Sequence, residues 1–200
     1  AERKSQALQR MLTTPVHRWE IIAGHLLAMA VVTFLQQAVL VGLGQFLLGV
    51  DYLSAPVGIL LVMAALALWT ASLGLLISAL VKGEEQVVIW AMIAMFAFSA
   101  LGGAWFPLEF AGKTFSTIGH LMPTAWAMDG FQNIVLRGSG TGSALLPAGI
   151  LLAYAVGFDI TAAVTQSMGH DHYGKGWHNT SSIGTLGSTA AAAKMLGLDE

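Results

Sequence analysis

Residues 21–50 read IIAGHLLAMAVVTFLQQAVLVGLGQFLLGV, and this stretch contains no Lys, Arg, Asp or Glu. A helix needs roughly 20 mostly apolar residues to cross a hydrocarbon core about 30 Å thick. Three further stretches also lack these four residue types, at 52–81, 86–108 and 138–158. The pattern predicts an integral membrane protein, whose function concerns what crosses or gates a membrane.

The composition supports this class and excludes others. The chain has 200 residues, of which 56% are hydrophobic and 10% are charged, whereas soluble domains carry about 25% charged residues. The net charge of −2, with no dense basic patch, argues against nucleic-acid binding. The absence of Cys excludes a disulfide framework and thiolate zinc sites. Because the sequence begins with Ala1 rather than Met, we expect a piece of a longer protein.

The N-terminal segment, residues 2–18, holds four of the nine Lys and Arg residues. Its apolar side chains fall on one helical stripe, which ends at Pro15 because proline disfavours helix in the residue before it. Two interpretations stay open: a solvated juxtamembrane helix, or an interfacial helix that touches a partner. The basic cluster predicts that this end is cytoplasmic.

The apolar stretches predict membrane helices at about 19–49, 57–80 and 86–104. Residues 107–137 contain two short amphipathic patterns that predict half-helices lying in or dipping into the interface. A fourth helix is expected from about Ala144, but its apolar part ends at Asp159 and is short for a crossing. Beyond Thr165 the composition becomes rich in Gly, Ser, Thr and His, and no membrane segment is expected there.

Candidate chemical motifs are weak. A partial phosphate-loop match at residues 169–176 has Gly176 where Ser or Thr should follow the Lys, so we expect no nucleotide site. His170, His172 and His178 are a weak signal for a metal site, and a polar loop whose histidines serve structure or proton transfer is favoured, so no metal or cofactor is expected. His25 and His120 stand alone, and no catalytic set is predicted in the membrane part.

Three strings resemble the permeases of type-2 ABC transporters over about residues 2–157: MLTTPVHRWE at 11–20, GGAWFP at 102–107 and LMPTAWA at 121–127. The first string is similar to the coupling helix that docks on the ATP-binding subunit in that family. The resemblance implies that Leu12, Thr13, Pro15, Arg18 and Glu20 contact an ATPase subunit. It also implies an outer re-entrant helix pair, with the motif residues Gly102, Gly103, Phe106, Pro107, Pro123 and Trp126.

The tail, about residues 150–200, resembles a different family, the soluble helical MmgE/PrpD enzymes that include 2-methylcitrate dehydratase. The resemblance rests on the strings YAVGFD at 154–159 and GWHNTS at 176–181. It implies that His178 belongs to a former active site, in a fragment too incomplete to be active. We therefore expect a partial permease domain at 1–157 joined to a fragment at 158–200 that is not an independent domain.

Together these inferences predict an all-α, polytopic membrane protein. We expect a cytoplasmic coupling helix, three or four transmembrane helices, a re-entrant outer pair and a short helical or loop tail. The resemblance implies a non-enzymatic permease subunit of an ABC exporter in the plasma membrane, working as a dimer with two ATPase subunits. The alternatives are a fragment of a soluble lyase and a membrane scaffold that transports nothing.

Overall fold

A computed structural model describes residues 18–81, 83–168 and 179–196, and every regular element in these ranges is helical. Four helices in these ranges are long and apolar enough to cross a membrane, at Ile22–Leu47, Pro56–Leu80, Glu84–Leu101 and Thr141–Thr165. Even the shortest, at 18 residues, is about 27 Å long at 1.5 Å per residue. The expected all-α, polytopic architecture is confirmed.

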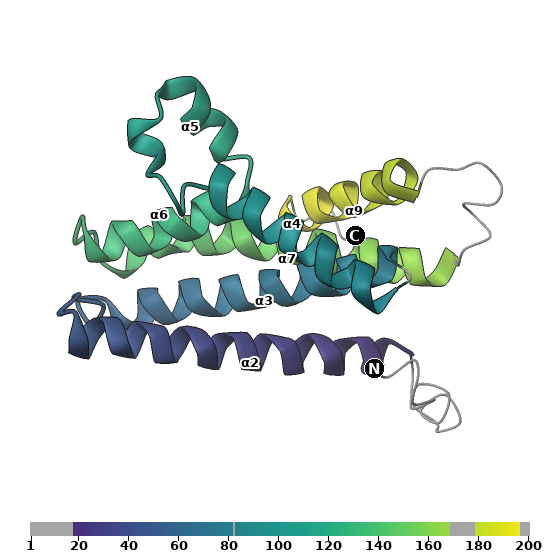
Figure 1. The fold of residues 1–200 in the computed structure, drawn as a ribbon, viewed down its shortest axis with the longest axis horizontal. Coiled ribbons are helices and arrows are strands. Elements are labelled where there is room, and N and C mark those ends of the chain that lie inside the picture. Colours follow the sequence, from purple (N-terminus) through teal and green to yellow (C-terminus); the bar gives the residue numbers. More distant parts are fainter. Residues whose placement is uncertain (1–17, 82, 169–178, 197–200) are drawn as a thin grey trace.

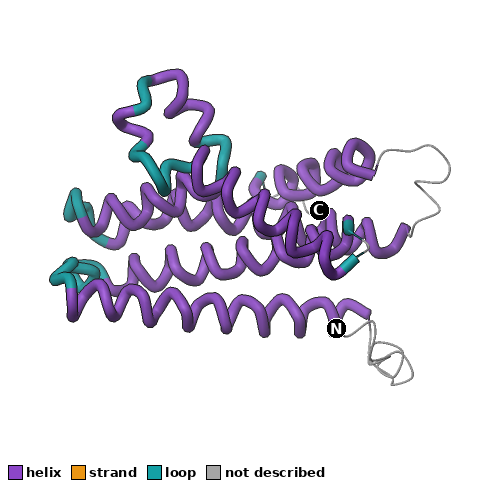
Figure 2. The backbone as a smooth tube through the Cα atoms, in the orientation of Figure 1, coloured by secondary structure: helices purple, strands orange, loops and turns teal. Residues whose placement is uncertain are grey.

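The four long helices are α2 (Arg18–Leu47), α3 (Pro56–Leu80), α4 (Glu84–Leu101) and α7 (Leu145–Met168). Helix α3 is central, because it contacts α2 on one side and α7 on another (Figure 1). The connections between α2 and α3 and between α6 and α7 lie at the same end of the molecule (Figure 2). The start of α2 and the α3–α4 connection lie toward the opposite end.

The turn between α2 and α3 is closed by a polar side chain of the first helix. Gln45 Oε1 accepts hydrogen bonds from the backbone N–H of Tyr52 at 2.9 Å and of Leu53 at 3.2 Å. Gly49 takes a positive φ of 66°, which glycine adopts without steric cost. Pro56 lies in the first turn of α3, where its missing N–H costs no helical hydrogen bond.

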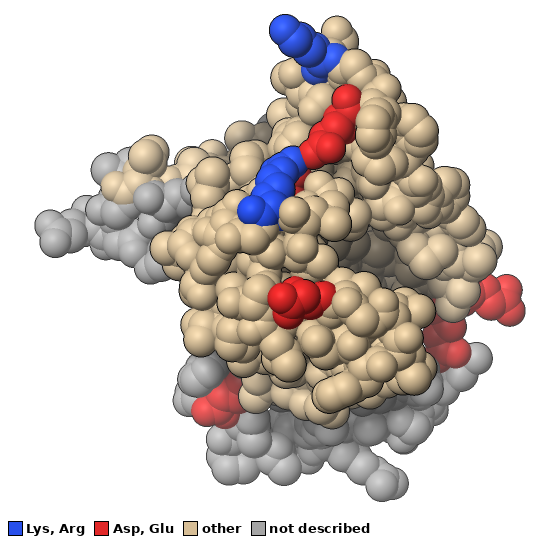
Figure 3. All heavy atoms as spheres, turned by 90° about the vertical axis from the view of Figure 1, so that its left-hand side faces the viewer, with Lys and Arg blue, Asp and Glu red and all other residues tan. Residues whose placement is uncertain are grey.

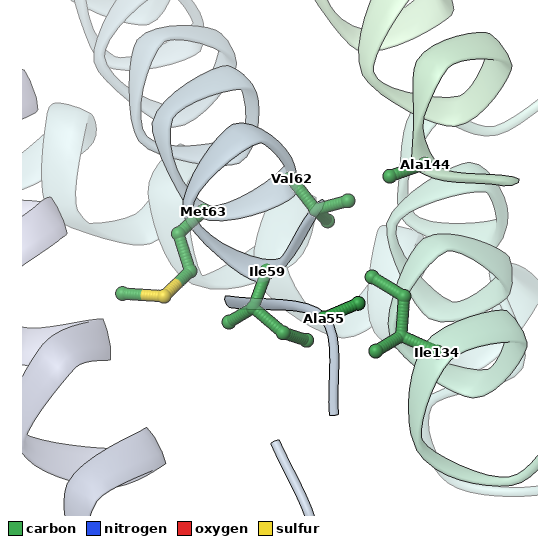
Figure 4. Close-up of a cluster of buried hydrophobic side chains, with 6 residues drawn as sticks. All are labelled: Ala55, Ile59, Val62, Met63, Ile134 and Ala144. Carbon is green, nitrogen blue, oxygen red and sulfur yellow. The ribbon is translucent and has the colours of Figure 1, made fainter. Parts of the chain in front are cut away.

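One cluster of buried side chains lies where α3 meets α6 (Pro123–Val135) and η2 (Thr141–Ala144), and a second lies where α3 meets α6 and α7. Figure 4 shows Ile59 and Val62 of α3 near Ile134 of α6 and Ala144 of η2. Gly58 allows this approach, because a Cβ there would lie 2.9 Å from Ile134 Cδ1. A small residue on α3 therefore lets neighbouring elements pack closely, as is common between membrane helices.

Helices α2 and α4 leave most of their apolar side chains uncovered. In the most apolar 18-residue stretch of each helix, 6% is buried in α2 and none in α4, whereas 50% is buried in α3. Such large apolar faces are unfavourable in water, at about 25 cal/mol per Å². They suit contact with lipid or with other transmembrane helices.

The fourth long helix corrects an expectation from the sequence. The apolar part was expected to stop at Asp159, but α7 continues through this residue to Met168, and the apolar span covers Thr141–Thr165. Its proline, Pro147, lies in the first turn, where the helix loses no hydrogen bond. The helix also passes the expected boundary at 157–158 without a break.

The last described residues of the chain, beyond residue 178, form α9 (Asn179–Met195), which packs along α7 (Figure 1). Gly187 is buried at the contact, and a Cβ there would lie 1.8 Å from Thr161 Oγ1 and 2.8 Å from the carbonyl oxygen of Gly157. Helical structure in the tail agrees with the expectation of a short helical or loop segment.

Candidate functional site

The candidate site lies in the segment between α4 and η2, residues 102–137, which we call the α5–α6 segment. It contains η1 (Leu108–Phe110), α5 (Lys113–Gly119) and α6. Two short helices were expected here from amphipathic spacing, and α5 and α6 confirm them. In Figure 1, α5 projects away from the long helices, while α6 lies alongside α7.

Two glycines end α4 and bring α6 against it. The backbone N–H of Gly102 donates to the Phe98 carbonyl at 2.8 Å, and the Thr124 hydroxyl donates to the same oxygen at 2.6 Å. A Cβ at Gly102 would lie 1.8 Å from Thr124 Oγ1. Gly103 has a φ of 81°, which favours glycine, and it packs against Leu108. The glycine pair therefore fixes where the chain turns from α4 into the α5–α6 segment.

Pro123 and Trp126 fix the junction between α5 and α6. Pro123 is buried in the first turn of α6, a position that suits its fixed φ. The Trp126 indole N–H donates to the carbonyl oxygen of His120 at 2.7 Å. The Trp126 and His120 rings also meet edge to face, with centroids 5.4 Å apart.

The His120 imidazole lies between two oxygen acceptors. Its Nδ1 lies 2.7 Å from the Ser116 carbonyl oxygen, and its Nε2 lies 2.9 Å from Asp129 Oδ2. The hydrogen bond to Ser116 raises the pKa of His120 above its ordinary value, burial opposes this, and the Asp129 carboxylate adds to the increase. Only the protonated ring can donate from both nitrogens at once, so the site favours the imidazolium.

A second charged pair lies nearby. Arg137 pairs with Glu109, and its guanidinium also donates to Asn133 Oδ1 at 2.6 Å. Both members are well exposed, so the pair contributes little to stability, about 0 to 1 kcal/mol. Figure 3 shows this end of the molecule as mostly uncharged, with basic and acidic side chains adjoining near the top of the view.

The glycines and the two charged pairs surround a pocket of about 290 Å³. Its polar lining comes from Glu109, Ser116, His120, Asp129, Gln132 and Arg137. Each cationic side chain already faces a carboxylate, so the pocket is suited to a small polar group rather than to a strongly charged ligand. Within residues 18–81, 83–168 and 179–196, no cluster of three His, Asp or Glu side chains is arranged to hold a metal ion.

Four of the predicted outer residues, Gly102, Gly103, Pro123 and Trp126, therefore shape this site. The other two, Phe106 and Pro107, lie on the exposed loop before η1, where the Phe106 ring meets that of Phe110. The sequence analysis missed the pairing of His120 with Asp129. The two residues are nine positions apart with Pro123 between them, so the spacing of one continuous helix does not predict that they meet.

Of the five residues predicted to contact an ATPase subunit, the structure describes only Arg18 and Glu20. Leu12, Thr13 and Pro15 lie outside the described residues, as does His178 of the tail. Arg18 is the first residue of α2, and Glu20 is exposed in its first turn. Their role in binding an ATPase stays a prediction.

A family of membrane transport proteins matches most of the chain. The model of the family described as ABC-2 family transporter protein covers residues 1–164. The chain belongs to the ABC-2 transporter family. With four helices long and apolar enough to cross a membrane, this member of the family is a multi-pass membrane protein.

A curated relative agrees with the family. The chain is 29% identical over 153 residues to the linearmycin resistance permease protein LnrN of Bacillus subtilis (strain 168). The match covers 76% of this chain but only 40% of the relative's length. No solved structure matches the ABC-2 chain.

The second resemblance receives no support from these comparisons. The family match reaches residue 164, beyond the boundary near 157 that the sequence analysis expected. Neither match supports an MmgE/PrpD fragment or a fusion. The assignment of the tail to that family stays a prediction.

Proposed function

We propose that this chain is the transmembrane part of an ATP-driven exporter, and that it couples ATP hydrolysis on a partner subunit to movement of its helices. The observation that carries the proposal is the family match over residues 1–164. The apolar helices and the name permease of the relative from Bacillus subtilis support it.

The proposed contact with the ATPase lies at the N-terminal end, in residues 2–20. The basic residues of this segment support a cytoplasmic location for it by the positive-inside rule. Rotation or tilting of this end would be transmitted along α2 to α3, because the two helices pack side by side. We propose Leu12, Thr13, Pro15, Arg18 and Glu20 as the ATPase-binding residues.

The α5–α6 segment lies toward the opposite end of the molecule, beside the α6–α7 connection. With a cytoplasmic N-terminal end, we propose that the pocket lies at the outer face of a plasma membrane. We propose that the segment closes the outer end of the translocation path in an assembly of two permeases and two ATPases. The uncovered faces of α2 and α4 supply apolar surface for lipid or for the second permease.

The partner contact is tested by purifying the full-length protein from its native membranes and identifying what accompanies it. We expect an ATPase subunit with a phosphate loop to co-purify with the wild type. Arg18→Ala and Glu20→Ala are expected to lower its recovery, since both remove a charged group from the proposed contact. Lys113→Ala, which removes an exposed charge from α5, is the matched control and should leave recovery unchanged. Unaltered co-purification in both N-terminal variants would contradict the contact.

A further inference from the structure

Asp159 is the only Asp, Glu, Lys or Arg within the apolar span Thr141–Thr165. The residue is partly buried, and its Oδ1 atom is buried with no hydrogen-bond partner among the described residues. An ionised carboxylate inside a membrane helix is costly, and such residues generally mark ion or proton pathways. A buried polar atom without a partner in a native structure also needs a physical explanation.

The neighbouring helix α3 offers Asp159 one polar group. The side-chain group of α3 that interacts with the Asp159 carboxyl is the hydroxyl of Ser72, which is completely buried. That hydroxyl already donates its single proton to the Leu68 carbonyl oxygen at 2.9 Å. In this arrangement only the lone pairs of the Ser72 oxygen remain for Asp159.

No described charge near Asp159 offsets an ionised carboxylate. Helix α3 carries no ionisable residue, and neither does η2. On α7 itself Tyr154 donates its hydroxyl proton to the Leu121 carbonyl oxygen at 2.7 Å, and on α6 Asp129 is bound to His120. Helix α9 carries Lys194, but it packs on the side of α7 that holds Gly157 and Thr161. Asp159 lies about 160° around the helix from Thr161, at 100° per residue.

We propose that Asp159 is a proton-binding site inside the helix bundle, with Ser72 as the acceptor for the bound proton. A carboxylate can only accept hydrogen bonds, whereas the neutral acid donates one. The neutral acid therefore matches the free lone pairs of Ser72 and removes the charge from the apolar contact between α3 and α7. When that contact opens to water, the proton leaves to solvent and the carboxylate is hydrated.

A second atom in the same contact fits this account. The Trp69 Nε1–H is a buried donor without a partner among the described residues, and Trp69 lies one turn before Ser72 on α3. Trp69 packs in one cluster with Ala155, which lies one turn before Asp159 on α7. The contact between α3 and α7 therefore holds a second buried polar group without a partner among the described residues. The inference rests on the membrane-spanning helices and does not require ATP-driven export.

The proposal is tested on the full-length protein in its native membranes with dicyclohexylcarbodiimide, an apolar reagent that modifies protonated carboxyl groups. The acid's proton moves to a nitrogen of the reagent, and the carboxylate oxygen bonds to its central carbon, so no other reactant is needed. Peptide mass spectrometry should place the adduct on Asp159 and not on the exposed Asp51. Labelling should decline as the pH rises and disappear in Asp159→Asn.

Two results would overturn the site. One is the absence of an adduct at Asp159 at every pH at which the protein stays folded. The other is equal labelling of Asp159 by a water-soluble carbodiimide, because that would show the carboxyl to be open to water.

A stability measurement gives an independent check on Ser72. Ser72→Ala should lower the unfolding temperature of the wild type more than that of Asp159→Leu, because only the wild type loses the proposed pairing in addition to the bond from Ser72 to Leu68. Equal losses in both backgrounds would contradict the pairing.

Discussion

His120 Nε2 lies 2.9 Å from Asp129 Oδ2, and this contact joins the end of α5 to the middle of α6. The same imidazole is bound through Nδ1 to Ser116 of α5. One side chain therefore connects the projecting helix to the helix that packs on the bundle. Because protonation allows both contacts, the stability of this junction depends on pH.

The first prediction concerns this pH dependence. The pKa of His120 lies above its ordinary value of 6.5, so the stabilisation is complete below that value and is lost as the pH rises through the raised pKa. We expect Asp129→Asn to lower the unfolding temperature at mildly acidic pH. The difference from wild type should shrink as the pH increases, when unfolding is followed in detergent from about pH 5.5 to 8.5.

Glu109→Gln is the matched control for this experiment, because it breaks the neighbouring pair with Arg137, which contains no histidine. Its effect on the unfolding temperature should stay the same across this pH range. A difference between Asp129→Asn and wild type that does not change with pH would contradict the assignment of an imidazolium.

The second prediction concerns the close contact of α4 with α6. Gly102→Ala places a methyl group against Thr124 Oγ1, and the resulting overpacking should destabilise the protein by about 1 to 3 kcal/mol. The free energy of unfolding in detergent measures the effect. Gly149→Ala is the control, since Gly149 is exposed on α7 with nothing within 4 Å of an added Cβ. If the two variants are equally stable, the contact is not as tight as described.

The third prediction concerns the packing of the tail helix. Gly187→Ala puts a methyl group onto Thr161 and should separate α9 from α7 locally. Limited proteolysis should then cleave the tail sooner than in wild type. Gly184→Ala lies on the same helix with open space around it, and it should protect the tail slightly because alanine favours helix by about 1 kcal/mol. Identical cleavage rates for the two variants would refute the contact.

The long helices were predictable because the membrane sets a length and an apolar composition that the sequence must meet. Helix α3 begins and ends within one residue of its expected bounds, since Pro56 and the polar connection after Leu80 mark them. The fourth crossing was underestimated because a single carboxyl at Asp159 was taken to end it. The structure instead continues the helix through Asp159, whose carboxyl is partly buried in the bundle and whose Oδ1 has no hydrogen-bond partner among the described residues.

The site was less predictable than the helices. The glycines and Trp126 were identified from motifs, but the His120–Asp129 pair depends on the angle between α5 and α6. That angle follows from Pro123 and from the hydrogen bond of Trp126 to the His120 carbonyl oxygen, neither of which appears as a periodic pattern. The Asp129 side chain is 28% exposed in this arrangement.

The membrane crossings are the central claim, and labelling of single cysteines tests them most directly. These 200 residues contain no Cys, so Ser54→Cys, Glu85→Cys and Ser139→Cys each add one reactive group here at an exposed position. In a full-length protein freed of other cysteines, a maleimide that cannot cross membranes should label Ser54→Cys and Ser139→Cys in intact cells. It should label Glu85→Cys only after the membrane is opened. Labelling of all three positions from the same side would contradict the account.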